Sequence, residues 1–371
     1  MLNKKFLFCC KKIFLCNDYN IFLIFFKFKI IFMKNLKWLL ISFLFIGCEP
    51  DKNDIVIEPV VNQWVFVACE GNYGASNGSI SMINQLGEVK HVKEMGDVVQ
   101  SVEVYKNKLF VIINNSHKIK AFDITSEGLR LPGIEIDTDG SSPREMKIIN
   151  KKLYFTNWNS SDVKILNLDN YLIEGSIAVE GKPESIEVEG TNLWVGIQMN
   201  NDYSDGNKLL KISTVTNSIV ETFEIGKGPT SITIQDNNVY IANTFYDANY
   251  NAFYGSSRLN IVNKEVDISY YGAGIVCGGD VLSYNNSAIF RSFEGGAALL
   301  GNDLNILEQT KIGSYDPSQL YSSEIIDGIF YFGITNYNDI NQVKIVDFNN
   351  TEIATYDVGL FPGDFAIWKS N

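Results

Sequence analysis

Histidine is nearly absent from this sequence, which has only His91 and His117 in 371 residues. Two histidines outside any metal-ligand spacing cannot build most zinc sites, and His117 alone would have to carry the proton transfers of a histidine-dependent lyase. The sequence also lacks a Gly-x-Ser-x-Gly nucleophile elbow and a phosphate-binding loop. We therefore expect no catalytic residue, no bound metal and no cofactor.

Cysteine is scarce where the chain is expected to fold. Three of the six cysteines lie in residues 1–32 and one is Cys48, which leaves Cys69 and Cys277. Two cysteines make no disulfide framework. We expect two separately buried thiols, with a Cys69–Cys277 bridge as the alternative.

Basic residues are also few. The chain has 31 Lys and Arg against 43 Asp and Glu, and residues 1–47 hold eight of the former and one of the latter. The remainder has 23 against 42, a net charge of −19. So acidic a domain is a poor partner for nucleic acid or for anionic lipid surfaces.

The N-terminal region predicts an exported lipoprotein. From Met33, the basic Lys34 and Lys37 precede an apolar run over 39–46 that is too short to span a bilayer. The run ends in Gly47-Cys48, which resembles the lipobox of bacterial lipoproteins. The resemblance implies a signal peptide over 33–47 and lipidation of Cys48; the alternative is an ordinary membrane anchor with an incidental cysteine.

Residues 1–32 have no helical or strand period. We expect them to be an untranslated upstream segment, with an additional N-terminal membrane segment as the alternative. Residues 48–62 are charged and carry two prolines, so they predict a lipidated tether. Glu49, Asp51 and Asp54 resemble the acidic surface-display signal of Bacteroidetes lipoproteins. This implies an outer-membrane protein, lipid-anchored at the cell surface, whose only membrane contact is the anchor.

A repeat of about 44 residues fills the rest of the chain. Each unit opens with a glycine corner, continues with a strand and a short polar turn, and reaches a second strand rich in aromatics, such as "KLYFTNW" or "NVYIANT". Proline recurs just inside five corners. The corner glycines are Gly96, Gly140, Gly181, Gly226, Gly272, Gly313 and Gly359.

Four short strands per repeat predict an all-β fold, a β-propeller over 63–371. A two-sheet sandwich is the alternative, but it gives no reason to repeat the same corner. The region begins with a second-strand sequence, "WVFVACE", and ends with a corner and first strand, "GLFPGDFAIW". These two pieces complete one blade, so we predict seven blades of four antiparallel strands, closed by the N- and C-terminal strands.

The strands of the form Leu-Tyr-Phe-x-Asn and Val-Tyr-Ile-Ala-Asn, between Gly-x-x-Pro corners, resemble the YVTN/YncE-like seven-bladed propellers. The opening "CEGNYGASNGSISM" resembles a DUF5074-like group of Bacteroidetes lipoproteins. That group includes surface propellers that capture corrinoids for a TonB-dependent cobalamin transporter. The resemblance covers about residues 64–371 and implies a corrinoid as ligand and such a transporter as partner.

The two ends of the blades differ in sequence. First-to-second turns are short, as in "NKK" at 150–152, whereas second-to-third loops are long and present aromatics among Asn, Asp and Ser. Those loops and the blade corners must share one face. Aromatics with amide neighbours suit a flat, polar-edged ligand. The expected ligand-binding residues are Asn72, Tyr73, Asn157, Trp158, Tyr203, Phe245, Tyr246, Tyr250, Phe253, Tyr254, Phe293, Tyr315 and Tyr337.

The sequence thus predicts a monomeric, non-enzymatic capture protein that binds a small nutrient ligand. One alternative is a metal-assisted hydrolase or lactonase at the channel mouth, using carboxylates such as Glu70, Glu145, Glu184 and Glu294. Another is a surface interaction module without a small ligand. Asp137–Gly140 and Asn201–Gly206 faintly suggest calcium loops, but both lack the spaced acid that completes such a site.

Overall fold

A computed structural model describes residues 62–249, 251–274, 279–338 and 341–370. These residues form 29 strands and no helix, so none of them lies in a helix long and apolar enough to cross a membrane. The predicted leader, the lipidation site Cys48 and most of the tether lie outside the described residues, as do Tyr250 and Cys277. The leader, the anchor and the tether therefore stay predictions.

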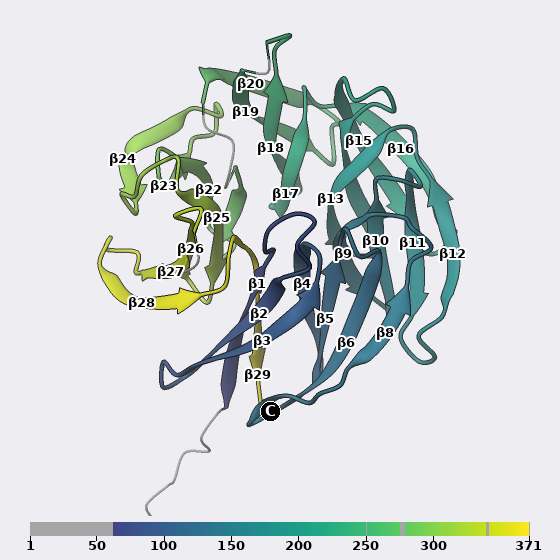
Figure 1. The fold of residues 1–371 in the computed structure, drawn as a ribbon. Helices are drawn as coiled ribbons and strands as arrows, with labels where there is room; N and C mark the ends of the chain where they lie inside the picture. The colour runs from purple at the N-terminus through teal and green to yellow at the C-terminus, as the bar shows by residue number, and fades with distance from the viewer. Residues whose placement is uncertain (1–61, 250, 275–278, 339–340, 371) are drawn as a thin grey trace, which may run out of the picture. The chain divides into compact units, whose positions relative to one another are not determined.

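The strands form seven sheets arranged around a ring, and we number these blades 1 to 7 (Figure 1). Blade 1 contains β29 (Pro362–Lys369), β1 (Gln63–Cys69), β2 (Gly78–Asn84) and β3 (Val89–Gly96). Blade 2 contains β4 (Val99–Tyr105), β5 (Lys108–Ile113), β6 (Lys118–Thr125), β7 (Gly128–Leu129) and β8 (Ile134–Asp137). Blade 3 contains β9 (Pro143–Ile149), β10 (Lys152–Asn157), β11 (Asp162–Asn167) and β12 (Ile173–Ala178).

Blades 4 to 7 follow in chain order. Blade 4 contains β13 (Lys182–Glu189), β14 (Asn192–Met199), β15 (Asp205–Ser213) and β16 (Ser218–Glu224). Blade 5 contains β17 (Pro229–Gln235), β18 (Asn238–Tyr246), β19 (Ala252–Asn260) and β20 (Val266–Ala273). Blade 6 contains β21 (Val281–Tyr284), β22 (Ala288–Phe293), β23 (Gly296–Leu300) and β24 (Ile306–Ile312). Blade 7 contains β25 (Leu320–Ile326), β26 (Ile329–Ile334), β27 (Asn341–Val346) and β28 (Glu352–Val358).

Burial along the strands explains why the second strand of each repeat is apolar and the fourth strand is mixed. The second strand of each blade is buried on both faces, so it is almost continuously apolar, as in β5. The fourth strands lie at the rim, and β16 alternates between exposed and half-buried residues. The core is therefore a series of apolar layers between neighbouring blades, with seven separate clusters of buried side chains.

The ring closes as predicted. β1 pairs antiparallel with β29, which brings Trp64 opposite Trp368 near the two ends of the described chain. Both indoles are buried, and each N–H has a partner: the carbonyl oxygen of Thr125 at 3.0 Å for Trp64, and Oδ1 of Asn107 at 3.0 Å for Trp368. Closure thus joins the chain ends and ties both to blade 2. Seven blades of four antiparallel strands are confirmed.

Blade 2 differs from the regular plan. Its outer edge is divided between β7 and β8, and both pair with β6. Pro132 lies in the interruption, and it has no N–H to contribute to a ladder. The fourth strand of this blade is therefore split, which the repeat did not predict.

Cys69 is a free, fully buried thiol at the end of β1. Burial raises the pKa of this thiol to about 11. In residues 49–371 carrying Cys277→Ser, we expect Cys69 to be inert toward Ellman's reagent at pH 8 and to react fully in guanidinium chloride, because thiolate is the reactive form. Fast reaction of the native protein would contradict this burial.

Candidate functional site

The loops divide between the two ends of the blades as predicted. First-to-second turns such as 106–107 and 150–151 hold only two residues, whereas the second-to-third loops gather with the corners at the opposite end, which we call the loop face. A cavity of about 800 Å³ opens there. Blades 1, 2, 3, 4 and 7 contribute to its wall. Its lining is Glu70, Gly71, Asn72, Tyr73, Val98, Gln100, Asn114, Asn115, His117, Ser142, Arg144, Trp158, Asn159, Tyr203, Tyr321 and Phe361.

Four of the residues expected to bind ligand meet in this cavity. Asn72 and Tyr73 come from the β1–β2 loop, Trp158 from the β10–β11 loop, and Tyr203 from the β14–β15 loop. Tyr73 is 81% exposed and Tyr203 is 65% exposed. Such exposure leaves the rings unused by the core and open to a ligand.

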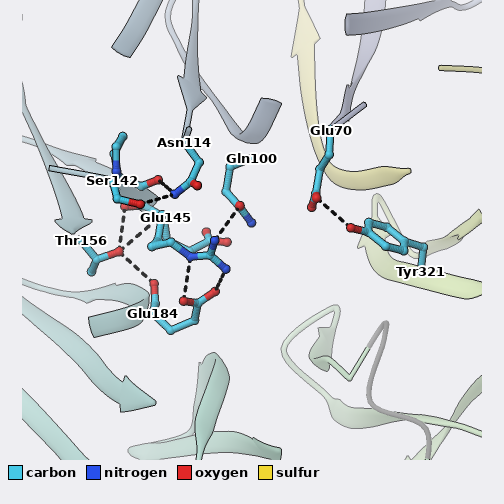
Figure 2. Close-up of polar contacts among 10 residues, drawn as sticks. Glu70, Gln100, Asn114, Ser142, Glu145, Thr156, Glu184 and Tyr321 are labelled. Carbon is cyan, nitrogen blue, oxygen red and sulfur yellow. Dashed lines mark hydrogen bonds and ion pairs between the residues drawn. The ribbon is translucent and has the colours of Figure 1, made fainter. Parts of the chain in front are cut away.

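Arg144 is the cation of this cavity. Its Nε and Nη2 donate to the two carboxylate oxygens of Glu184 at 2.8 and 2.5 Å, and its Nη1 donates to Oε1 of Gln100 at 3.0 Å (Figure 2). The guanidinium also lies 4.7 Å from the ring centre of Trp158. Burial opposes the charge, but the Glu184 carboxylate outweighs it, so the pKa of Arg144 is raised. The bidentate ion pair with Glu184 fixes the Arg144 guanidinium, which lies beside the ring of Trp158 in the wall.

Glu70 and Tyr321 form a second polar pair, apart from the first in Figure 2. The Tyr321 hydroxyl donates to Oε2 of Glu70 at 2.7 Å and so links blade 7 to blade 1. Burial raises the pKa of Glu70, while this hydrogen bond and the charge of Arg144 act in the opposite direction. The raised pKa favours the uncharged form of Glu70, so its carboxyl group can offer a polar oxygen to the cavity without adding a full negative charge.

Asp97 fastens the loop that carries Tyr73. Its two carboxylate oxygens accept hydrogen bonds from the N–H of Gly74 at 2.9 and 3.0 Å. Oδ2 also accepts a hydrogen bond from Nδ2 of Asn115 at 2.5 Å. Asp97 is buried, and its carboxylate holds two loops at once: the β1–β2 loop through Gly74 and the β5–β6 loop through Asn115.

We expect Asp97→Asn to loosen residues 71–77, since an amide nitrogen would replace one of the accepting oxygens. The cost should be about 1–3 kcal/mol of unfolding free energy. Thermal unfolding and hydrogen exchange of 71–77 would measure it, with the exposed Asp139→Asn as matched control. Equal exchange in both variants would show that Asp97 does not position the loop.

The remaining polar groups of the wall are amides, hydroxyls and one imidazole. The N–H of Ser142 donates to Nδ1 of His117 at 3.1 Å, so the proton of the neutral ring sits on Nε2. Asn114 donates to Ser142 Oγ and to the Pro143 carbonyl at 3.1 and 2.8 Å (Figure 2). The cavity thus offers hydrogen-bond donors and acceptors with its ionic groups already paired.

The aromatic loop of blade 5 is a hairpin extension. β18 runs to Tyr246 and β19 starts at Ala252, so most of the expected loop is paired strand. Phe245 and Phe253 stack with ring centres 5.7 Å apart, and Phe245 also contacts Tyr270 at 4.9 Å. These rings pack on one another, outside the lining of the large cavity.

The other expected site residues lie apart from that cavity. Asn157 is fully buried, and its amide bonds to Ser141, Phe155 and Asp162. The hydroxyls of Tyr315 and Tyr337 donate to Glu352 and to the Ser318 carbonyl at 3.0 and 2.6 Å. Tyr254 and Phe293 line a second cavity, of about 250 Å³, between blades 5, 6 and 7.

The channel below the large cavity is lined by carboxylates. Glu103, Glu145, Glu324 and Asp364 line its walls, together with Lys147. Burial raises the pKa of Glu103 to about 7, of Glu324 to about 8 and of Asp364 to about 6. Among the described residues, no three His, Cys, Asp or Glu side chains form a group that could hold a metal ion.

Sequence reasoning missed Arg144, Gln100 and Tyr321. Each directly follows a paired residue at the start of a first strand, as do Glu184, Thr230 and Gly363 in other blades. The corner proline marks this position in four blades, so the repeat contained the signal.

Comparison with known proteins supports the fold. No family model matches the sequence, and no curated protein does. A candidate 6-phosphogluconolactonase from Bacteroides uniformis aligns with a TM-score of 0.61 and 12% identity, over 83% of this chain and 99% of its own. AztD from Citrobacter koseri gives 0.53 and 10%, over 84% and 99%. The WD40 domain of Neurospora crassa Pan2 gives 0.53 and 6%, over 72% and 82%. At these identities the likeness is one of fold: the chain is a seven-bladed β-propeller.

Proposed function

We propose that this protein is a non-enzymatic binding protein that captures a small organic ligand in the loop-face cavity. The observation that carries the proposal is the convergence of exposed tyrosines, a Trp158–Arg144 wall and amide groups from five blades around about 800 Å³. Ligand sites of proteins combine such apolar faces with a few placed polar groups.

The charges of the cavity point to the kind of ligand. Arg144 is neutralised by Glu184, and the carboxyl of Glu70 is held by Tyr321. The site therefore does not demand a strongly charged ligand. Tyr73 and Tyr203 offer flat faces, and Asn72 and Gln100 offer polar atoms, which suits a ring system with an amide- or hydroxyl-bearing edge.

A corrinoid is the ligand that the sequence resemblance implies, and it meets this description. On the same ground we assign the chain to the YVTN/YncE-like, DUF5074-like lipoprotein propellers. A TonB-dependent outer-membrane transporter, to which the ligand is passed, is part of this proposal. It rests on the repeat and on the residues before and after Cys48.

The direction of β1 adds an orientation to the proposal. β1 starts at Gln63 and ends at Cys69, where the chain enters the loop of Tyr73 on the loop face. The tether therefore joins the propeller at the end opposite the cavity.

Calorimetric titration of residues 49–371 with cobalamin and cobinamide tests the proposal. We expect saturable binding of at least one of them, with competition between the two. No heat with either compound would refute the corrinoid. Binding that persists when the cavity rings are removed would place the site elsewhere on the loop face, with the hairpin of Phe245 and Phe253 as the next region to vary.

A further inference from the structure

Blade 6 buries an arginine where the other blades bury small or apolar residues. Arg291 pairs with Val281, one residue beyond Phe290 on β22. The register of the other six second strands places at the same position the apolar Val67, Val111, Phe155, Val195, Ile241 and Phe332. Packing between blades therefore needs no charge here, and Arg291 is a departure from the repeat.

The buried positive charge of the Arg291 guanidinium has few groups to compensate it. The residue is 1% exposed, and no carboxylate among the described residues lies within ion-pair distance of it. Nη1 donates to the carbonyls of Asp280 and Ser292 at 3.1 and 3.3 Å, Nη2 reaches the Gly255 carbonyl only at 3.5 Å, and Nε has no partner in the described chain. A buried cation held by long hydrogen bonds to carbonyls is costly.

The carboxylate that acts on Arg291 through its charge already accepts hydrogen bonds from another residue. Asp280 acts on Arg291 through its charge, but its Oδ2 accepts the N–H and Oγ–H of Ser323 at 3.1 and 3.2 Å. Burial raises the pKa of Asp280 and lowers that of Arg291, so each group is disfavoured in its charged form. The pair does not close into a salt bridge.

Arg291 forms part of the wall of the second cavity. This space of about 250 Å³ is also lined by the rings of Tyr254 and Phe293, by Leu320 and by the carboxylate-bearing Glu294. The Arg291 guanidinium lies 5.9 Å from the Tyr254 ring centre. The second cavity shares no lining residue with the loop-face cavity.

We propose that this second cavity is a binding site for a small monocarboxylate, whose carboxylate pairs with Arg291 and whose apolar part contacts Tyr254 and Phe293. The planar guanidinium matches a carboxylate, and burial strengthens the pairing. Glu294 faces the same space, so a dianion such as sulfate is repelled more than a monoanion. The site stands independently of the ligand proposed for the loop-face cavity.

Titration of residues 49–371 with benzoate and propionate at constant ionic strength tests the site, by calorimetry and by the rise in Tm. We expect saturable binding, weakened about tenfold or more in Arg291→Met, since a hydrogen bond to a charged group is lost. Glu294→Gln should bind about two- to fivefold more tightly because a like charge is removed.

Stability without ligand gives a second readout. Because an uncompensated buried charge is costly, Arg291→Met should have a Tm equal to or above that of the parent protein in the absence of carboxylates. An Arg291→Met protein that fails to fold, or melts well below the parent, would show that the guanidinium is structural and overturn the proposal. Equal binding of sulfate and benzoate, or undiminished benzoate binding by Arg291→Met, would overturn it as well.

Discussion

The propeller should lose thermal stability as the pH rises from about 5 to about 8. Enclosure in the channel raises the pKa of Glu103 to about 7 and of Glu324 to about 8, each from an ordinary value of 4.5, and the pKa of Asp364 to about 6 from 3.8. Between the unfolded and folded pKa values, the folded state holds more protons than the unfolded state. The free energy of unfolding therefore falls as the pH rises through this window.

The variant Glu324→Gln isolates this effect in one side chain. At pH 8 the amide avoids an ionised carboxylate beside Asp364, so we expect Tm to rise by a few degrees, about 2 °C or more per kcal/mol in a domain of this size. At pH 5 the glutamate is already protonated and nearly isosteric with glutamine, so the two proteins should melt together. Differential scanning calorimetry at both values makes the comparison.

The exposed carboxylate of Glu308 on β24 provides the control. Glu308→Gln should not reproduce the pH-dependent gain, because it lies outside the channel. A parent protein whose Tm is constant over this range, or a Glu324→Gln protein that is equally destabilised at both pH values, would contradict the assignment of the channel carboxylates as protonated groups.

Replacing Tyr73 and Tyr203 together by alanine should abolish most ligand binding and leave stability nearly unchanged. The two rings are 81% and 65% exposed, so their removal should cost within about 0.5 kcal/mol of unfolding free energy. Aromatic anchors of a binding site often contribute about 2 kcal/mol each, so the double variant should bind at least about 30-fold more weakly. Titration with the ligand and thermal unfolding measure the two effects.

Tyr246→Ala is the matched control for the double variant. Tyr246 is also an exposed tyrosine of the loop face, but it lies on the β18–β19 hairpin and not in the cavity lining. It should bind as the parent does. If Tyr246→Ala loses binding while the double variant keeps it, the hairpin and not the cavity is the binding region.

The repeat pattern was enough to predict the fold. Corners spaced at about 44 residues imply one blade per unit. The second-strand sequence at Trp64 and the first-strand sequence at Phe365 imply closure in a shared blade. These features are local and periodic, so each can be seen in the sequence without knowledge of any distant contact. The split edge of blade 2 was not predicted, because it departs from the period.

The loops that bear aromatics could also be identified in the sequence, but which of their rings line the cavity could not. Tyr73 and Tyr203 reach the large cavity, whereas Phe245 and Phe253 stack on each other in a hairpin. Asn157 and Trp158 are adjacent in sequence, yet Asn157 is buried at the end of β10 and Trp158 lines the cavity. Composition does not distinguish these cases, because a side chain's direction depends on strand register and on the neighbouring blade.

The number of blades, the place of ring closure and the face on which the long loops gather can be predicted from the sequence, because all three follow from the period and the strand direction. Which side chains meet on that face depends on contacts between blades. Glu70 and Tyr321 are 251 residues apart, and Arg144 and Glu184 are 40 residues apart. Arg144 and Glu184 meet from neighbouring first strands, and Tyr321 of a first strand reaches Glu70 at the end of β1 in the next blade. Both contacts join neighbouring blades, so they depend on the closed ring.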